Sequence, residues 1–301
     1  MTQFKSGFIA IVGRANAGKS TLVNALVGQK ISIVSPKPQT TRENIMGIWT
    51  DEQCQMVFVD TPGALKPKTR LGDFMVKSIE HATVDVDCVV LVIDGHNGIK
   101  DADFELLDKY SKLDTPLVVA VTKTDISQPE KIMAELSKLN KYDNVKDVFA
   151  ISARKNKGIK EFKEYLKSYL KDDKMYFDED YVTDKSQRFI VCELIREKTL
   201  LLLNEEVPHG VGIQLNKMTY DEEAMRWEID ANIIVEKASH KAIVLGKQGQ
   251  MIKNIGMTAR ESIQKSLDAR VRLDLWVRVK EDWRNDQRVL NEIGYNKSDI
   301  Q

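Results

Sequence analysis

Short apolar runs alternate with longer amphipathic stretches along the first 170 residues of the chain. The apolar runs have the length of buried strands and lie at 8–12, 54–60, 88–94, 117–123 and 148–152. The stretches between them carry apolar residues at helical spacing, and strands that alternate with helices are typical of a mostly parallel sheet. We therefore predict an α/β domain over residues 1–170, with helices on both faces of its sheet.

The pattern changes after residue 170. Residues 171–185 contain six acidic residues and show no apolar period, which predicts a linker. Apolar residues recur at helical spacing over 186–204 and in two stretches within 241–267, whereas 227–235 and 271–279 alternate between apolar and polar positions as half-buried strands do. The sequence thus predicts a second domain, of the α+β class, over residues 186–301.

The composition is that of ordinary globular domains. The chain has 301 residues, enough for about two domains, and is 42% apolar and 30% charged. Its cysteines, Cys54, Cys88 and Cys192, lack the spacing of a zinc site and indicate no disulfide framework. No apolar run approaches the roughly 20 residues of a membrane span, so we expect a cytoplasmic protein.

Charge is unevenly distributed along the chain. The formal net charge is zero, but residues 239–280 contain nine Lys or Arg against three Asp or Glu. A basic region in a neutral chain favours binding to an anionic partner such as nucleic acid, although a solvated helix face is the more common origin of basic residues. The second domain is therefore the candidate for a nucleic-acid contact.

A glycine-rich stretch, GRANAGKST at 13–21, follows the first predicted strand and precedes a predicted helix. Its spacing matches the phosphate-binding P-loop, in which backbone N–H groups surround phosphates, the lysine reaches the outer phosphates and the serine binds Mg²⁺. A plain turn is the alternative for so short a pattern. The nucleotide-binding residues predicted here are Gly13, Arg14, Ala15, Asn16, Ala17, Gly18, Lys19, Ser20 and Thr21.

Two further segments complete a candidate triphosphate site. The stretch DTPG at 60–63 ends a predicted strand, which places Asp60 near Mg²⁺ through a water molecule and lets the Gly63 N–H reach a γ-phosphate. The polar segment 35–43 offers the Thr41 hydroxyl to Mg²⁺ while the γ-phosphate is present. An ordinary turn and an ordinary flexible loop are the alternatives. The residues predicted from these segments are Thr41, Asp60, Thr61, Pro62 and Gly63.

Residues at the ends of the next two strands predict which nucleotide base the site binds. In TKTD at 122–125, the Asp125 carboxylate can accept hydrogen bonds from N1–H and the exocyclic amine of guanine. Adenine has no proton at N1 and would leave a buried carboxylate unpaired. In ISA at 151–153, backbone N–H groups can reach guanine O6. The predicted base-binding residues are Thr122, Lys123, Asp125, Ser152 and Ala153.

In order and spacing, these five stretches resemble the G motifs of the Ras-like translation-factor GTPases. The segment GRANAGKSTLVNALVGQKISIVSPKPQTTRENIMGI, together with DTPG, is similar to the Era GTPases. The resemblance implies a Ras-like P-loop GTPase domain that binds GTP or GDP with Mg²⁺. The chain departs from the family at Thr122, where asparagine is usual, and at Ala15 and Ala17, where proline and valine are usual. We expect guanine selection to survive these changes, because Asp125 and Lys123 remain.

Catalysis is predicted to rest on positioning and on charge neutralisation. Ala64 follows Gly63 where Ras-type enzymes carry a water-orienting glutamine, so we expect slow intrinsic turnover. By resemblance to potassium-dependent members of this group, the side-chain oxygen of Asn16 is a candidate ligand for K⁺. A loop residue that tolerates unusual backbone angles is the alternative for Asn16. The predicted catalytic residues are Lys19, Ser20, Thr41, Asp60 and Gly63.

The basic region contains GKQG at 246–249, between two predicted helices. Glycines without a Cβ let backbone approach phosphates, and the next helix begins with its N–H groups pointing the same way, as in KH domains that clamp about four nucleotides. A plain turn is the alternative for GXXG alone. Trp283 is a candidate for base stacking, with packing as its alternative. The predicted RNA contacts, which we expect to be to phosphate, are Lys241, Gly246, Lys247, Gln248, Gly249, Lys253 and Arg260.

The second half also resembles the carboxy-terminal, type II KH domain of the Era GTPases, from SQRFIVCELIREK to LWVRVKEDW. The resemblance implies binding to small-subunit ribosomal RNA near the 3′ end of 16S rRNA during 30S assembly, control of that binding by GTP, and peripheral contact with the inner membrane. We expect a monomer. Two alternatives are a P-loop ATPase or kinase, which Asp125 opposes, and a membrane-associated signalling GTPase, which GXXG opposes.

Overall fold

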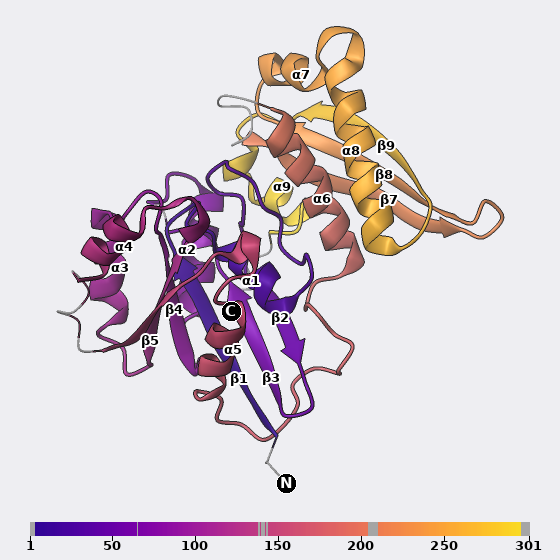
Figure 1. The fold of residues 1–301 in the computed structure, drawn as a ribbon. Coiled ribbons are helices and arrows are strands. Elements are labelled where there is room, and N and C mark those ends of the chain that lie inside the picture. Colours follow the sequence, from indigo (N-terminus) through magenta and orange to yellow (C-terminus); the bar gives the residue numbers. More distant parts are fainter. Residues whose placement is uncertain are drawn as a thin grey trace. The chain divides into compact units, whose positions relative to one another are not determined.

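The computed structural model describes residues 4–64, 66–137, 139, 142, 144–203 and 210–295 (Figure 1). The chain divides into two compact units. The segments of unit 1 are Met1–Val34, Thr41–Lys66 and Met75–Asp184. The segments of unit 2 are Ser35–Thr40, Pro67–Phe74 and Lys185–Gln301.

A six-stranded sheet forms the centre of unit 1, with the strand order β2-β3-β1-β4-β5-β6. β2 pairs antiparallel with β3, and every other pair is parallel. The five predicted strands are present, but the apolar pattern missed β2, in which Gly47 interrupts the apolar residues. The strands are β1 (Lys5–Gly13), β2 (Ile45–Thr50), β3 (Cys54–Asp60), β4 (Cys88–Asp94), β5 (Leu117–Thr122) and β6 (Val145–Ala150).

Helices cover both faces of this sheet (Figure 1). On one face, Ala10 and Val12 of β1 join a core that includes Leu107 and Tyr110 of α3. On the other face lie α1 and α5, which contact each other, and Leu22 of α1 is completely buried. The helices of the first half of the chain are α1 (Lys19–Val27), α2 (Arg70–His81), α3 (Asp101–Tyr110), α4 (Pro129–Leu136) and α5 (Ile159–Lys167).

The carboxyl ends of the parallel strands place the motif residues at one edge of the sheet. β1, β3, β4 and β5 end at Gly13, Asp60, Asp94 and Thr122. β3 lies on one side of β1, and β4 lies on the other. The chain segment that follows β1 therefore runs toward one edge of the sheet, and the segment that follows β4 runs toward the opposite edge. Such a reversal opens a crevice where ligands of open α/β sheets bind.

Residues 171–184 form no helix or strand, but they are hydrogen bonded along the strands of unit 1. Asp172 pairs with Ser6, and Thr183 pairs with Gly47, as isolated bridges. The side-chain oxygen of Gln55 accepts hydrogen bonds from the backbone N–H groups of residues 176 and 177 at 2.9 and 3.0 Å. The acidic segment that the pattern predicts as a linker is therefore held against the sheet for most of its length.

Unit 2 contains a three-stranded sheet in the order β7-β8-β9, with β7 and β8 antiparallel and β8 and β9 parallel. Helices α6 and α8 pack on one face through buried residues such as Ile195, Ile233 and Ile263. The pattern missed β7. The strands are β7 (Gly212–Asp221), β8 (Arg226–Val235) and β9 (Val271–Val279), and the helices are α6 (Gln187–Leu202), α7 (Ala238–Leu245), α8 (Gln250–Leu267) and α9 (Gln287–Glu292).

The predicted fold class is confirmed: a mostly parallel sheet with helices on both faces is followed by an α+β arrangement. Among the described residues, no helix has both the length and the apolar character that crossing a membrane requires. The predicted second domain includes residues 204–209 and 296–301, which lie outside the described part of the chain.

Candidate functional site

The loop between β1 and α1 closes around the side chain of Lys19. Its Nζ donates hydrogen bonds to the carbonyl oxygens of Gly13 and Arg14 at 3.1 and 2.9 Å, and the residue is only 5% exposed. Burial lowers the pKa of Lys19 to about 8, and the charge of Asp60 opposes that shift. An ammonium group beside the N-terminus of α1 forms a compact site for an anion such as phosphate.

Three oxygen-bearing side chains lie together beside Lys19. The hydroxyl oxygens of Ser20 and Thr41 are 2.8 Å apart. Asp60 is completely buried, and among the described residues neither of its carboxylate oxygens has a hydrogen-bond partner. Burial raises the pKa of Asp60, while Lys19 and two serine hydroxyls favour its ionised form. An unpartnered buried carboxylate next to two hydroxyls fits the oxygen ligands that Mg²⁺ prefers.

Ser32 is a member of this cluster that the sequence pattern did not reveal. Its buried hydroxyl lies close enough to Asp60 to favour the ionised form of that carboxylate. The side chain of Asn24 holds the backbone of Ser32 through bonds of 2.9 and 2.8 Å. The only signal in the sequence is a polar residue between two isoleucines, which is too common to identify a site.

The segment after β3 packs directly on the phosphate loop. A Cβ on Gly63 would lie 2.6 Å from Cα of Ala15 and 2.7 Å from its backbone nitrogen, so only glycine fits there. The backbone N–H of Ala64 donates to Gly13 at 3.1 Å. The Thr61 hydroxyl donates to the carbonyl of Ile11 at 2.8 Å, so it supports the sheet. The close approach brings the DTPG backbone beside the predicted phosphate site.

Two ion pairs hold the phosphate loop in place. Arg14 Nε donates to Asp103 Oδ1 of α3 at 2.7 Å, and the Asp103 side chain is completely buried. Lys123 Nζ donates to Asp94 Oδ2 at 2.7 Å and to the backbone oxygen of Asn16 at 2.8 Å. Burial opposes ionisation of Asp94, but the hydrogen bonds from Lys123 and Asn97 outweigh it and lower its pKa. Arg14 therefore ties the phosphate loop to α3, and Lys123 ties it to Asp94 at the end of β4.

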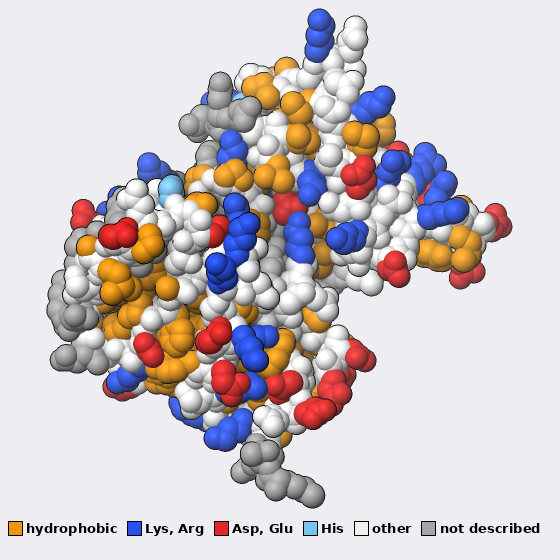
Figure 2. Space-filling model, viewed as in Figure 1, with side chains coloured by type: hydrophobic (Ala, Val, Ile, Leu, Met, Phe, Trp, Pro, Cys, Tyr) orange, Lys and Arg blue, Asp and Glu red, His pale blue; other side chains and the backbone are white. Residues whose placement is uncertain are grey.

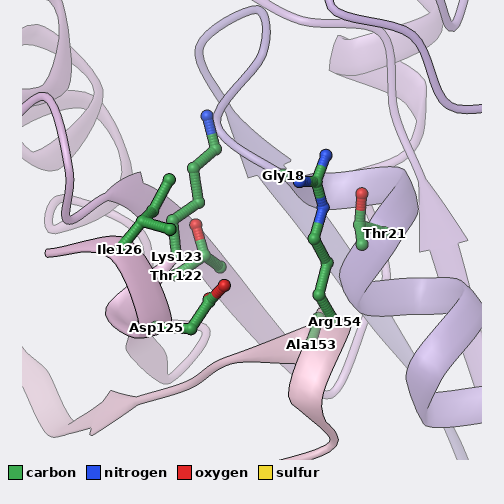
Figure 3. Close-up of a pocket in the computed structure, with 8 residues that line it drawn as sticks. All are labelled: Gly18, Thr21, Thr122, Lys123, Asp125, Ile126, Ala153 and Arg154. Atoms are coloured by element: carbon green, nitrogen blue, oxygen red, sulfur yellow. The ribbon is translucent and has the colours of Figure 1, made fainter.

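A pocket of about 140 Å³ lies beyond the loop at the ends of β5 and β6, and Figure 3 shows its lining. In this view, Thr122, Lys123 and Asp125 lie on one side of the pocket, and Thr21 and Arg154 lie on the other. Of the lining residues, the sequence motifs did not indicate Ile126 and Arg154. The full lining is Gly18, Thr21, Thr122, Lys123, Asp125, Ile126, Ala153 and Arg154.

The carboxylate of Asp125 is oriented for an acceptor role in this pocket. Ser152 Oγ donates to Asp125 Oδ1 at 2.7 Å, and this bond lowers the pKa of Asp125. Asp125 is exposed in the structure. The penalty that an unsuitable base would suffer therefore arises only when the base itself covers the carboxylate and removes it from water.

In unit 2, the stretch 246–249 forms a tight turn between α7 and α8. Gly246, Gln248 and Gly249 have φ angles of 69°, 52° and 75°. A Cβ on Gly246 would lie 2.6 Å from Cβ of Met251, whereas a Cβ on Gly249 would meet no atom within 4 Å. Gly249 is also the N-cap of α8 and makes no side-chain cap bond. The first N–H groups of α8 therefore have no capping side chain over them.

A groove of about 380 Å³ lies between α8 and β9. It brings together Lys253 and Arg260, two of the predicted RNA contacts, while Lys241 on α7 does not line it. The apolar and small lining residues were missed, because they match an ordinary buried helix face. Figure 2 shows Lys and Arg side chains over the region of α8. The lining residues are Ile252, Lys253, Gly256, Met257, Arg260, Leu273, Asp274 and Leu275.

The stacking role considered for Trp283 is wrong, and the packing alternative holds. Trp283 has no exposed surface, and its Nε1–H donates to the carbonyl of Gly210 at 2.9 Å. A ring that is buried and hydrogen bonded within unit 2 cannot present a face to a base.

Comparisons with known proteins find two domain families in the chain. The family model of the 50S ribosome-binding GTPases matches residues 8–123, and the KH domain model matches residues 206–284. The chain is 44% identical to the GTPase Era of Clostridium tetani, an alignment that covers 98% of this chain and 100% of that protein. It is 41% identical to the GTPase Era of Caldanaerobacter subterraneus subsp. tengcongensis, over 97% of this chain and 98% of that protein.

Two solved structures share the fold over nearly the whole length. One is Era in complex with MgGDPNP and nucleotides 1506–1542 of 16S ribosomal RNA, with a TM-score of 0.93 and 34% identity. The other is a variant of Aquifex aeolicus Era bound to GDP·AlF₄⁻, with a TM-score of 0.92 and 34% identity. Each alignment covers 97% of this chain and 99% of the solved chain.

Proposed function

The chain belongs to the Era family of GTPases, and from this premise we propose that it uses GTP to control its binding to 16S ribosomal RNA near the 3′ end during 30S assembly. Membership of the family makes it an enzyme that hydrolyses GTP. One observation supports the proposed link between GTP and RNA binding. The same chain has a pocket that contains the Asp125 carboxylate and a GXXG turn next to a basic groove. The relative solved with MgGDPNP and an RNA fragment supports the same pairing of ligands.

In this proposal, the phosphate end of the nucleotide lies on the loop amides of residues 13–18 and on Lys19. Ser20, Thr41 and Asp60 would hold Mg²⁺, and Ser32 would orient Asp60. The ion, when bound, supplies positive charge to the β- and γ-phosphates. The backbone N–H of Gly63 would donate a hydrogen bond to the γ-phosphate. Because Ala64 has no group that could orient water, intrinsic hydrolysis is expected to be slow.

Asn16 remains a candidate K⁺ ligand in this proposal. Its backbone is left-handed, with φ of 60°, a conformation that asparagine tolerates better than most residues. The left-handed backbone alone can explain why asparagine occupies this position. It does not test whether the side chain also binds K⁺. Hydrolysis rates measured in K⁺ and in Na⁺ at equal ionic strength decide between them, because equal rates would remove the K⁺ role.

The RNA-binding part of the proposal rests on unit 2. The turn at 246–249 offers backbone to phosphates, and Lys253 and Arg260 supply charge along the groove. The apolar lining residues Ile252 and Leu275 offer a surface for the faces of unpaired bases. We further propose that the protein acts as a cytoplasmic monomer with a peripheral fraction at the inner membrane, as the resemblance to the family implies.

The test is RNA binding as a function of the nucleotide. The full chain is titrated into a labelled RNA of the 16S 3′ end, with GDPNP or with GDP present, and Mg²⁺ in both. We expect a difference in affinity between the two states and competition by unlabelled RNA of the same sequence. Equal affinity in both states would contradict control by GTP, and binding to anionic lipid vesicles in preference to RNA would favour the signalling alternative. Crosslinking to RNA in cells, followed by sequencing, then identifies the contacted nucleotides.

A further inference from the structure

Asn24 lies on α1 four residues after Ser20, one helical turn further along the same face. Its side chain makes three hydrogen bonds to the chain that follows the helix. The Oδ1 atom accepts from the backbone N–H groups of Ile31 and Ser32, each at 2.9 Å, and Nδ2 donates to the carbonyl of Ser32 at 2.8 Å. Asn24 therefore holds the backbone of these two residues against the helix that carries Ser20.

The chain returns to Asn24 because α1 ends in a tight turn. Gly28, the C-cap residue, has a φ of 84° and donates its N–H to the carbonyl of Asn24 at 2.9 Å. Glycine adopts this left-handed conformation without strain, which lets the chain turn away from the helix axis. Ile31 and Ile33 are both buried, so the chain is anchored in the core on either side of Ser32. The position of Ser32 is therefore fixed by the helix and by the core together.

Ser32 in turn lies beside Asp60. Both residues are buried, and the Ser32 hydroxyl is close enough to the carboxylate to stabilise its charge. The hydroxyls of Ser20 and Thr41 belong to the same cluster, but they lie 2.8 Å from each other, and their oxygen atoms are the proposed ligands of Mg²⁺. A hydroxyl has one hydrogen to donate. Because Ser32 is not one of the proposed ligands, its hydrogen is available to hold the carboxylate of Asp60.

We propose that Asn24 is a positioning residue for Mg²⁺: it fixes Ser32, and Ser32 holds the Asp60 carboxylate in the orientation that the ion requires. The inference rests on the proposed Mg²⁺ site at Ser20, Thr41 and Asp60. Side chains that hold a metal ligand in place commonly change metal affinity by roughly 10–100-fold when they are removed. One face of α1 thus places two ligands, Ser20 directly and Asp60 through Ser32.

The first experiment measures how Mg²⁺ slows the release of a fluorescent GDP, mant-GDP, from the full chain. Release rates are recorded at a series of free Mg²⁺ concentrations and in EDTA, for the wild type and for Ser32→Ala. We expect the Mg²⁺ concentration that gives half of the full slowing to rise about tenfold in Ser32→Ala, and the rate in EDTA to stay within about twofold. A merely structural role would raise the rate in EDTA as much as in Mg²⁺. That outcome, or an unchanged Mg²⁺ requirement, would overturn the proposal.

The second experiment tests whether Asn24 acts through Ser32. Asn24→Ala removes the three bonds to the backbone of residues 31 and 32, so we expect it to raise the Mg²⁺ requirement about tenfold and to lower the unfolding temperature. Because both changes then act on the same carboxylate, the double variant Asn24→Ala/Ser32→Ala should need less than about threefold more Mg²⁺ than Ser32→Ala alone. Independent effects, which multiply to about 100-fold, would overturn the role of Asn24. Asn24→Ser replaces the alanine variant in both comparisons if that variant does not fold.

Two matched controls separate this inference from a general loss of stability. Ser6→Ala removes another buried hydroxyl, at the start of β1, and Asn144→Ala removes an amide that donates to the carbonyls of Ser111 and Leu113 at 3.3 and 2.9 Å. Both variants should keep the wild-type Mg²⁺ requirement, and a shift in either as large as that of Ser32→Ala would overturn the proposal. Release from the wild type that Mg²⁺ does not slow would contradict the proposed Mg²⁺ site itself.

Discussion

The nucleotide site and the groove of unit 2 use polar groups in opposite ways. In the nucleotide site, Lys19, Asp60 and Thr122 are 5%, 0% and 2% exposed, and each has a defined position relative to a neighbouring backbone or side chain. In the groove and its turn, Lys247 and Lys253 are exposed at the surface. Buried polar groups are costly unless they are paired, whereas exposed charges interact weakly with any one neighbour.

This difference predicts two kinds of recognition. A site whose polar groups are buried, or become buried when the ligand covers them, distinguishes ligands by single atoms, because one wrong atom leaves a group unsatisfied. A site made of exposed charge beside a tight turn binds a phosphate chain with affinity that changes gradually with salt and with each charge removed. The predictions below test this contrast, from the largest expected effect to the smallest.

Asp125→Asn should have the largest effect. The asparagine would donate where guanine also donates, so GTP affinity should fall by roughly 10³–10⁴, while xanthosine triphosphate, which carries an acceptor at that position, should gain affinity. Nucleotide competition assays measure both. Asp114→Asn makes the same change in charge on an exposed residue before the start of β5 and should leave both affinities unchanged. A loss of similar size in the Asp114 variant would show that selectivity does not reside in Asp125.

Gly249→Asp should weaken RNA binding by about tenfold or more at low salt, because its carboxylate would repel phosphate at the turn. The position has space for a Cβ, and its φ of 75° is one that aspartate adopts more readily than most residues. Filter binding measures the effect.

The matched control for that variant is Gly294→Asp, at another glycine with positive φ where an added Cβ would meet no atom within 4 Å. It should leave RNA binding unchanged, and both variants should bind GDP as the wild type does. If RNA affinity is the same for Gly249→Asp as for the control, the turn does not contact RNA.

The pH dependence of nucleotide binding should follow Lys19, whose pKa burial lowers to about 8. Below pH 8 the amine is already charged, so GDP affinity should be flat from about pH 6.5 to 7.5. Above pH 8 the ligand-free amine loses its proton, and binding must restore it, so affinity should fall by up to about tenfold per pH unit. Calorimetry in buffers of different ionisation enthalpy should detect proton uptake at about pH 8.5 and almost none at about pH 6.5. Constant affinity from about pH 7 to 9 would contradict the lowered pKa.

Lys253→Gln should have the smallest effect, a loss of a few-fold in RNA affinity that disappears at high salt. If Lys253 neutralises one phosphate of single-stranded RNA, the slope of log affinity against log salt should decrease by about 0.7. Lys265→Gln, on the same helix but outside the groove lining, is the control. Identical salt slopes for the two variants would place the RNA path elsewhere on unit 2.

The sequence by itself determined the local elements and the main motif residues. The apolar runs indicated five strands of the first sheet, and the motif spacing alone predicted roles for Lys19, Asp60 and Asp125 in nucleotide binding. The strand predictions succeeded because strand and helix periods depend on neighbours within a few positions along the chain. The strands β2 and β7 were missed, because the apolar positions of β2 are interrupted and those of β7 are mostly half-buried or exposed.

Only the tertiary structure decided which groups meet across the chain. It placed Ser32 beside Asp60, buried Trp283 against Gly210, held residues 171–184 along the sheet, and placed the hydroxyl of Thr122 within reach of two carbonyls, one in the phosphate loop and one in β4. Partners separated by tens of residues leave no periodic trace in the sequence. Their contacts depend on how whole elements pack, which fixes the positions of buried polar atoms only once the sheet and its covering helices are complete.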